Sequence, residues 1–221
     1  MKYVVVDLEM NCVNKIYKKE RQISHMETIE IGAVAINEKF QEISSFKTFV
    51  KPQYNHEIAK NLQKLTGITT QMVQDAPYFK EAIHQFFDWC ISLNDEIQIY
   101  QWSESDRDQI VREIELKKYV VTEKEEELLS RWTNFQREYE TKLGLDRDIS
   151  LTDALMFAGK DFDGQAHDAL NDARNTAILL SIVKDPEKCR QALSTVIEAL
   201  QPTKMSTSLG DMFDFSKIVL G

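Results

Sequence analysis

A short run of β-branched residues that ends in two acidic residues constrains this chain more than any other feature. Residues 3–6 read Tyr-Val-Val-Val, and Asp7-Leu8-Glu9 follows at once. Continuous apolar runs of this kind are typical of strands buried on both faces, as in α/β proteins. Residues two apart on a strand point to the same face, so the carboxyl groups of Asp7 and Glu9 project together. Such a pair repels itself unless a cation lies between the two groups, although among 36 acidic residues a D-x-E also arises by chance.

Further periodic segments complete an α/β pattern. Residues 28–36 and 42–50 are predicted as two strands joined by a polar turn at 37–39, which makes the first three strands antiparallel. Residues 97–100 are predicted as a fourth strand. Helical spacing predicts helices over 57–65, 79–93, 106–117, 150–157 and 168–183. The highly charged stretch 118–147 is predicted to be a solvated helical excursion, and one amphipathic helix and the polar segment PTKMSTSLGD are predicted after residue 185.

Composition narrows the class of protein. At 221 residues with 43% hydrophobic residues, one α/β domain with a sizeable core is expected. Three cysteines without CxxC spacing, a first segment unlike a signal peptide and no apolar run of transmembrane length predict a cytoplasmic protein with no membrane partner. The net charge of −9 argues against a protein that binds long duplexes, but not against a metal-dependent nuclease that acts at strand ends.

Asp106 is the second acidic candidate. It follows the predicted strand 97–100, at the edge where α/β sheets place their ligands. An Asp in the first turn of a helix is also favoured by the helix dipole alone, and Glu104 or Asp108 would serve that purpose equally well.

The third candidate group is His167-Asp168-Ala169-Leu170-Asn171-Asp172. Five residues along a helix turn through about 500°, so the side chains of His167 and Asp172 would diverge if both were helical. They converge only if His167 lies on the preceding loop, for which Gly164 is suited, with Asp168 as the N-cap. A structural histidine at a helix start remains the alternative.

Together, four carboxylates and one histidine are what two-metal hydrolysis of a phosphodiester requires. In this interpretation Asp7 bridges two metal ions, Glu9 and Asp172 complete the first site, and Asp106 acts on the second. His167 would accept the proton of the attacking water, because imidazoles titrate near neutral pH.

At these residues the sequence resembles the DEDDh (DnaQ-like) 3′→5′ exonucleases of the ribonuclease H-like fold. DLEMNC, the Asp of WSESDRDQI and GQAHDALNDARNTA correspond to the three motifs of that family, and ETIEIGAV and LTGIT agree between them. Within the family, DLEMNC, Trp132-Thr133-Asn134 and AHDALNDARNTA resemble the histone-mRNA and small-RNA 3′ exonucleases and their bacterial KapD-like relatives.

The resemblance carries specific expectations. It implies an exonuclease domain over residues 1–183. Residues 184–221 lie outside the resemblance and are predicted to form a helical extension and tail, through which a protein partner could dock. It implies two Mg²⁺ or Mn²⁺ ions, release of 5′-mononucleotides from single-stranded RNA or DNA 3′ ends, and a terminal nucleotide held near Met10, Thr66 and Trp102. The expected fold is α/β, a five-stranded mixed sheet flanked by helices. Two rival functions stay open: an exonuclease-fold regulatory interaction module, and a short-oligonucleotide phosphodiesterase.

Overall fold

A computed structural model describes residues 1–200, so the predicted polar segment PTKMSTSLGD lies outside the described residues. Five strands form one sheet in the order β3-β2-β1-β4-β5. The pairs β1–β2 and β2–β3 are antiparallel, whereas β1–β4 and β4–β5 are parallel, which confirms the predicted mixed sheet. The strands are β1 (Lys2–Cys12), β2 (Met26–Ile36), β3 (Glu42–Phe49), β4 (Ile97–Gln101) and β5 (Trp132–Asn134).

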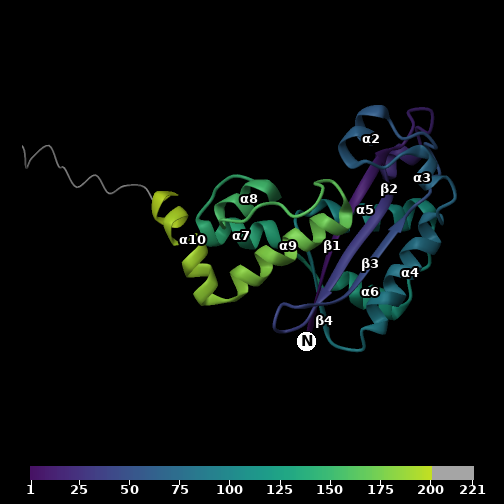
Figure 1. The fold of residues 1–221 in the computed structure, drawn as a ribbon. Coiled ribbons are helices and arrows are strands. Elements are labelled where there is room, and N and C mark those ends of the chain that lie inside the picture. The colour runs from purple at the N-terminus through teal and green to yellow at the C-terminus, as the bar shows by residue number, and fades with distance from the viewer. Residues whose placement is uncertain (201–221) are drawn as a thin grey trace, which may run out of the picture.

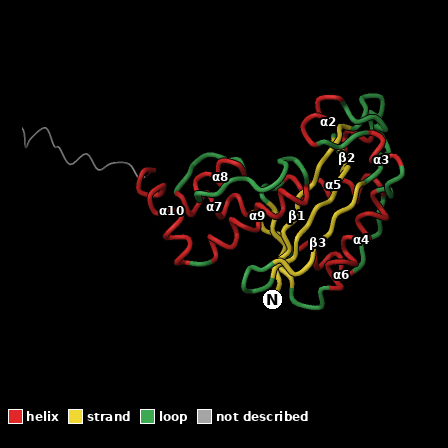
Figure 2. The backbone as a smooth tube through the Cα atoms, in the orientation of Figure 1, coloured by secondary structure: helices red, strands yellow, loops and turns green. Residues whose placement is uncertain are grey.

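Helices cover both faces of this sheet (Figures 1 and 2). In chain order they are α1 (Glu20–Ile23), α2 (Lys60–Thr66), α3 (Thr70–Gln74), α4 (Phe79–Ser92), α5 (Ser105–Lys117), α6 (Glu123–Ser130), α7 (Phe135–Leu143), α8 (Leu151–Phe157), α9 (Ala169–Lys184) and α10 (Pro186–Leu200). Among these described helices, none has both the length and the apolar character that a membrane crossing requires.

The alternation of β1 divides the core into two layers. Val4 and Val6 point to the side of α4, α5 and α6, whereas Val5 points to the side of α7, α8 and α9. All three valines are at most 1% exposed, as the β-branched run predicts for a strand covered on both faces. Asp7 and Glu9 have the parity of Val5, so they lie on the face that α9 covers.

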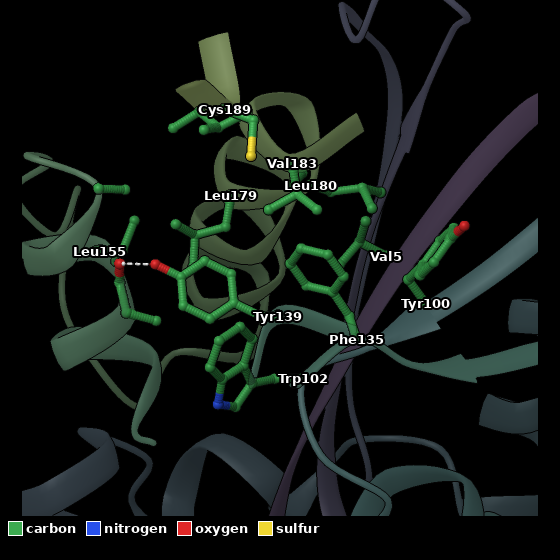
Figure 3. Packing of buried hydrophobic residues seen from close by; sticks show 14 of the residues in the cluster. Val5, Tyr100, Trp102, Phe135, Tyr139, Leu155, Leu179, Leu180, Val183 and Cys189 are labelled. Atoms are coloured by element: carbon green, nitrogen blue, oxygen red, sulfur yellow. Dashed lines mark hydrogen bonds between the residues drawn. The ribbon is translucent and has the colours of Figure 1, made fainter. Parts of the chain in front are cut away.

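Aromatic side chains from α7 fill the layer beside α9 (Figure 3). Phe135 and Tyr139 are fully buried, and the Tyr139 hydroxyl donates a hydrogen bond of 2.8 Å to the Ala154 carbonyl oxygen. Cys189 and Leu193 of α10 pack against the same layer. The result is a lobe of helices that holds the C-terminal half of α9 rigidly against the sheet.

The prediction that residues 118–147 are helical is confirmed in part by α6 and α7, but the prediction that this stretch is a solvated excursion was wrong. The stretch contains α6, the edge strand β5 and α7, and it supplies Phe135 and Tyr139 to the core. Most of its charged residues are exposed, although Glu125 of α6 and Glu140 of α7 are buried, and β5 is only three residues long. Two element boundaries also differ: β1 continues to Cys12, and the helix expected from residue 57 begins at Lys60.

Candidate active site

The first two acidic residues lie within β1. Asp7 pairs with Gly32 of β2 and Glu9 pairs with Glu30, and a register shift follows between Glu9 and Met10. Asp7 is half-buried and Glu9 is 8% exposed. Because β1 extends beyond the segment that α9 covers, both carboxyl groups lie where the helix begins rather than under its middle.

Asp106 reaches the same place from the other side of β1. β4 runs parallel to β1, and α5 begins at Ser105, so Asp106 lies in the first turn of that helix. It is 4% exposed, and the Leu8 backbone amide donates a hydrogen bond to its carboxylate. Burial against β1 distinguishes Asp106 from Glu104 and Asp108, which are both exposed.

His167 and Asp172 converge as the loop hypothesis requires. Asp168 is the N-cap of α9 and accepts a hydrogen bond from the Asn171 amide at 3.1 Å. His167 precedes it with a φ of 62°, outside the helix, and its backbone amide donates to Asp172 Oδ2 at 3.3 Å. One ligand atom each of Glu9, His167 and Asp172 lie within 4.8 Å of one another. These side chains, 163 residues apart at the extremes of the set, therefore form one cluster.

The pKa values of the four carboxyl groups in the cluster are all raised. Burial is the main reason that the pKa of Glu9 rises to about 8 and that of Asp106 to about 8. Burial raises the pKa of Asp172 to about 6. It also raises the pKa of Asp7 well above its ordinary value, and the nearby charges of Asp106, Asp172 and Glu9 raise it further.

A divalent cation fits this donor set. Oxygen donors from carboxylates are the ligands that Mg²⁺ and Mn²⁺ prefer. A cation would offset both the burial of these charges, which is the main cause of the raised pKa values, and the repulsion between them. Asp172 supplies a separate observation, because its Oδ1 is buried and has no hydrogen-bond partner. Buried polar atoms are rarely left without a hydrogen bond, so this oxygen of Asp172, near Glu9, is expected to be a metal ligand.

Gly32 determines how closely α9 approaches the sheet. A Cβ atom built on Gly32 would lie 2.2 Å from the Leu170 nitrogen and 2.3 Å from the Ala169 carbonyl carbon. Only a glycine therefore allows the first turn of α9 to rest directly on the β2 backbone opposite Asp7. This close approach brings Asp172, in that turn, within reach of β1.

Glu30 and Lys47 fix the same helix end. Glu30 is 1% exposed, and its Oε2 accepts a hydrogen bond of 2.9 Å from the Ala169 amide. Lys47 Nζ lies 3.1 Å from Glu30 Oε1 and 2.5 Å from Asp168 Oδ2. A lysine from the edge strand β3 thus connects a buried glutamate of β2 to the N-cap of α9.

Sequence reasoning did not assign roles to Glu30, Gly32 or Lys47. The available signal was ETIEIGAV, in which a charged residue and a glycine interrupt an apolar strand. A glycine inside a strand often marks the close approach of another backbone segment, which is what Gly32 does here.

The three predicted substrate contacts have other partners in the structure. Met10 packs against the layer formed by α4, and Thr66 is 4% exposed with its hydroxyl bonded to the Leu62 carbonyl oxygen at 3.0 Å. Trp102 is 8% exposed, with ring centroids 5.9 Å from Phe135 and 5.8 Å from Tyr139. Their contact with a terminal nucleotide stays a prediction.

Comparison with known proteins places this geometry in a family. Residues 4–180 match the exonuclease family. The chain is 30% identical to ERI1 exoribonuclease 2 of Xenopus laevis over 200 residues, which are 80% of this chain and 28% of that protein. It is 27% identical to 3′-5′ exoribonuclease 1 of Homo sapiens over 194 residues, which are 83% of this chain and 53% of that protein. The chain spans about a third of the length of the ERI1 exoribonuclease 2 proteins of Xenopus laevis, Mus musculus and Danio rerio.

Solved structures agree with the fold. The nuclease domain of 3′hExo, described as a DEDDh family member bound to rAMP, superposes with a TM-score of 0.72 at 21% identity, covering 84% of this chain and 92% of that domain. E. coli exonuclease I in complex with a dA16 oligonucleotide superposes with a TM-score of 0.60 at 13% identity, covering 90% of this chain and 42% of that protein. The predicted ribonuclease H-like fold is thereby confirmed. The match over residues 4–180 shows that the chain belongs to the exonuclease family.

Proposed function

We propose that this protein is a divalent-metal-dependent 3′→5′ exonuclease that releases 5′-mononucleotides from single-stranded RNA, DNA or both. One observation carries the proposal. Asp7, Glu9, Asp106 and Asp172 converge from β1, α5 and α9. Burial, together with nearby negative charges, raises the pKa of each carboxyl group. Such a cluster is unfavourable in the absence of a cation, and family membership names the chemistry that a cation would serve.

Each residue has a role in this proposal. Asp7, Glu9, Asp106 and Asp172 would hold two Mg²⁺ or Mn²⁺ ions, with Asp7 shared between them. When bound, the ions would neutralise charge on the attacking and leaving oxygens of the phosphodiester. His167 lies on an exposed loop beside Glu9 and Asp172, where its imidazole can take a proton from the attacking water and pass it to solvent. Asp106, in the first turn of α5, is the most buried of the four carboxylates, with 4% of its surface exposed.

Digestion of end-labelled single strands tests the proposal. RNA and DNA of the same sequence are incubated with Mg²⁺ or Mn²⁺, with and without EDTA. With either metal, the expected result is a ladder of progressively shortened strands and the release of 5′-mononucleotides. In EDTA, neither is expected. Cleavage of circular strands at the rate of linear ones would contradict an exonuclease, and equal rates with free and 3′-phosphorylated ends would contradict attack from the 3′ hydroxyl end.

The same experiment separates the rival functions. A short-oligonucleotide phosphodiesterase would leave long strands intact and hydrolyse only the shortest ones, whereas a regulatory interaction module would degrade neither. The cytoplasmic location and the docking of a protein partner through residues 184–221 stay predictions.

A further inference from the structure

A cluster of exposed lysines lies beyond the acidic site, at the end of β1. Three belong to the loop that follows β1 and two belong to α2, and together we call them the basic rim: Lys15, Lys18, Lys19, Lys60 and Lys64. Figure 1 shows this loop (dark purple) and α2 at the same end of the sheet. The two segments are connected, because the Asn14 amide donates to the Tyr54 carbonyl oxygen at 3.4 Å and the Tyr17 and Tyr54 rings meet at 5.1 Å.

The charge of the rim is opposite to that of the chain. Residues 13–25 and 51–70 contain seven Lys and Arg against two Glu, whereas the whole chain has 27 basic and 36 acidic residues. Within residues 1–200, no carboxylate lies within 4.0 Å of any rim lysine, although Lys47, Lys117 and Lys184 elsewhere each form an ion pair. Lys60 and Lys64 are four apart on α2, a spacing at which like charges repel. An acidic protein therefore keeps five cations unpaired on one surface.

The rim is joined rigidly to the acidic site. Cys12 lies three positions after Glu9 on β1, a distance of about 10 Å along an extended strand. Asn11 Nδ2 donates to the carbonyl oxygens of Asn55 and Glu57, each at 3.2 Å, which holds the segment that leads into α2. At the other end of α2, the Thr66 carbonyl oxygen accepts a hydrogen bond of 3.2 Å from Gln165, two residues before His167.

The side chains between the lysines suit an unpaired strand. Ile16 is 74% exposed at the tip of the loop, and the ring of Tyr17 beside it is half-buried. Single-strand binding surfaces combine cations that follow the phosphates with apolar or aromatic side chains against which bases stack. The basic rim has both, on the surface that adjoins the proposed site.

We propose that the basic rim binds the backbone phosphates of the strand upstream of the 3′ end. The inference rests on the proposed function and makes it more specific: the substrate is a single strand of several nucleotides, because a dinucleotide has no phosphate left for the rim. The rim then binds the strand away from the bond that is hydrolysed. Long substrates are therefore expected to have a lower KM than short ones, with a similar rate of the chemical step.

The test compares two substrates in one triple variant, Lys15→Gln, Lys18→Gln, Lys19→Gln. One substrate is a labelled single strand of about a dozen nucleotides, and the other is a p-nitrophenyl ester of a nucleoside 5′-phosphate, which has one phosphate and no upstream strand. For the strand, kcat/KM is expected to fall roughly tenfold at low salt, mainly through KM, and the slope of log(kcat/KM) against log[KCl] to become shallower by about 2. Hydrolysis of the ester is expected to be unchanged.

A matched variant removes the same charge elsewhere. Lys39, Lys124 and Lys142 are exposed on the β2–β3 turn, α6 and α7, and their replacement by Gln should leave both substrates unaffected. Equal effects of the two triple variants, or an unchanged salt slope in the rim variant while wild-type protein degrades the strand, would overturn the inference alone. A wild-type protein that hydrolyses neither substrate would overturn the proposed function and the inference with it.

Discussion

At the scale of single residues, one carboxylate oxygen of Asp172 indicates where the acidic cluster could bind a cation. Asp172 has two carboxylate oxygens with different surroundings: Oδ2 accepts a hydrogen bond from the His167 amide, and Oδ1 is buried without a partner. The hydrogen bond to Oδ2 orients the side chain, and Oδ1 is left without a partner. Burial raises the pKa of Asp7, and the nearby charges of Asp106, Asp172 and Glu9 raise it further.

The variant Asp7→Asn should be nearly inactive and fully folded. Removing one negative charge from a repelling group leaves the metal-free protein at least as stable as wild type. Loss of a metal ligand removes several kcal/mol of transition-state stabilisation, so less than about a tenth of the rate should remain. Single-turnover digestion and a thermal melt in EDTA measure the two effects. A variant that keeps more than this rate would exclude Asp7 as a shared metal ligand.

His167→Ala should separate a catalytic role from a structural one. If the imidazole accepts the proton of water, the rate should fall by roughly 10²–10⁴-fold, with Tm and metal binding unchanged because the carboxylates hold the ions. If His167 only shapes the loop before α9, Tm should fall and the rate should stay near that of wild type. His25→Ala, at another exposed histidine, is the control. Both quantities are read from the same preparation.

At the scale of elements, α9 is placed by contacts at its first turn rather than by its overall pattern. Alanines recur every four residues at Ala169, Ala173 and Ala177, a pattern typical of a helix that packs closely on a sheet, and all three are buried. How close it comes is determined by Gly32, and how it is turned is determined by Glu30 and Lys47.

Gly32→Ala should displace α9 and inactivate the protein. The added methyl group would overlap the backbone of Ala169 and Leu170, which should cost about 1–3 kcal/mol in stability and more than tenfold in rate. Gly144→Ala is the control, because that glycine has a φ of +69° but open space around its Cβ position. It should lower stability by about 1 kcal/mol and leave the rate unchanged. Equal losses of rate in the two variants would refute a positioning role for Gly32.

Lys47→Gln tests the connection between β3 and the start of α9. It leaves Glu30 buried without its cation, which should cost roughly 1–2 kcal/mol, since Lys47 itself is partly exposed. Arg174→Gln is the matched control, because it breaks another ion pair between α9 and β3, the exposed one with Glu42, and should cost less than about 0.5 kcal/mol. Urea unfolding of both variants gives the comparison. Lys47→Arg should restore most of the loss.

Elements with one clear period could be predicted from sequence, and composite ones could not. The run before Asp7, the apolar face of α4 and the N-caps Ser150 and Asp168 agree with expectation. The five predicted catalytic residues come together in space, because strand parity and helix starts place them; their roles remain predictions. The fifth strand escaped detection in residues 118–147, because β5 has three residues and is recognised only by its pairing with Ile99–Gln101.

At the scale of the whole molecule, the acidic cluster should make stability depend on pH and on metal. In the unfolded chain these carboxyl groups ionise near pH 4, whereas burial raises the folded-state pKa of Glu9 and Asp106 to about 8 and of Asp172 to about 6. Between these values the folded protein binds more protons than the unfolded chain, so stability falls as pH rises.

The Tm of metal-free protein is therefore expected to decrease between pH 5 and pH 8. Mg²⁺ or Mn²⁺ should raise Tm, and should raise it more at pH 8, where the ligands must otherwise be ionised without a counter-charge. Melts in EDTA and in excess metal at each pH provide the measurement. A Tm that rises with pH in EDTA would contradict the folded-state pKa values.

The late position of α9 in the chain determines when the cluster can form during protein synthesis. Asp7, Glu9 and Asp106 are translated first, but His167 and Asp172 arrive only with α9, a late element of the described residues that packs directly on β1 and β2. Domains fold from the N-terminus as they emerge, so an unfinished chain contains most of its acidic ligands and no complete centre. If these residues act as proposed, a nascent chain cannot hydrolyse the ribosomal and messenger RNA that surrounds it, and activity begins only once α9 has folded onto the sheet.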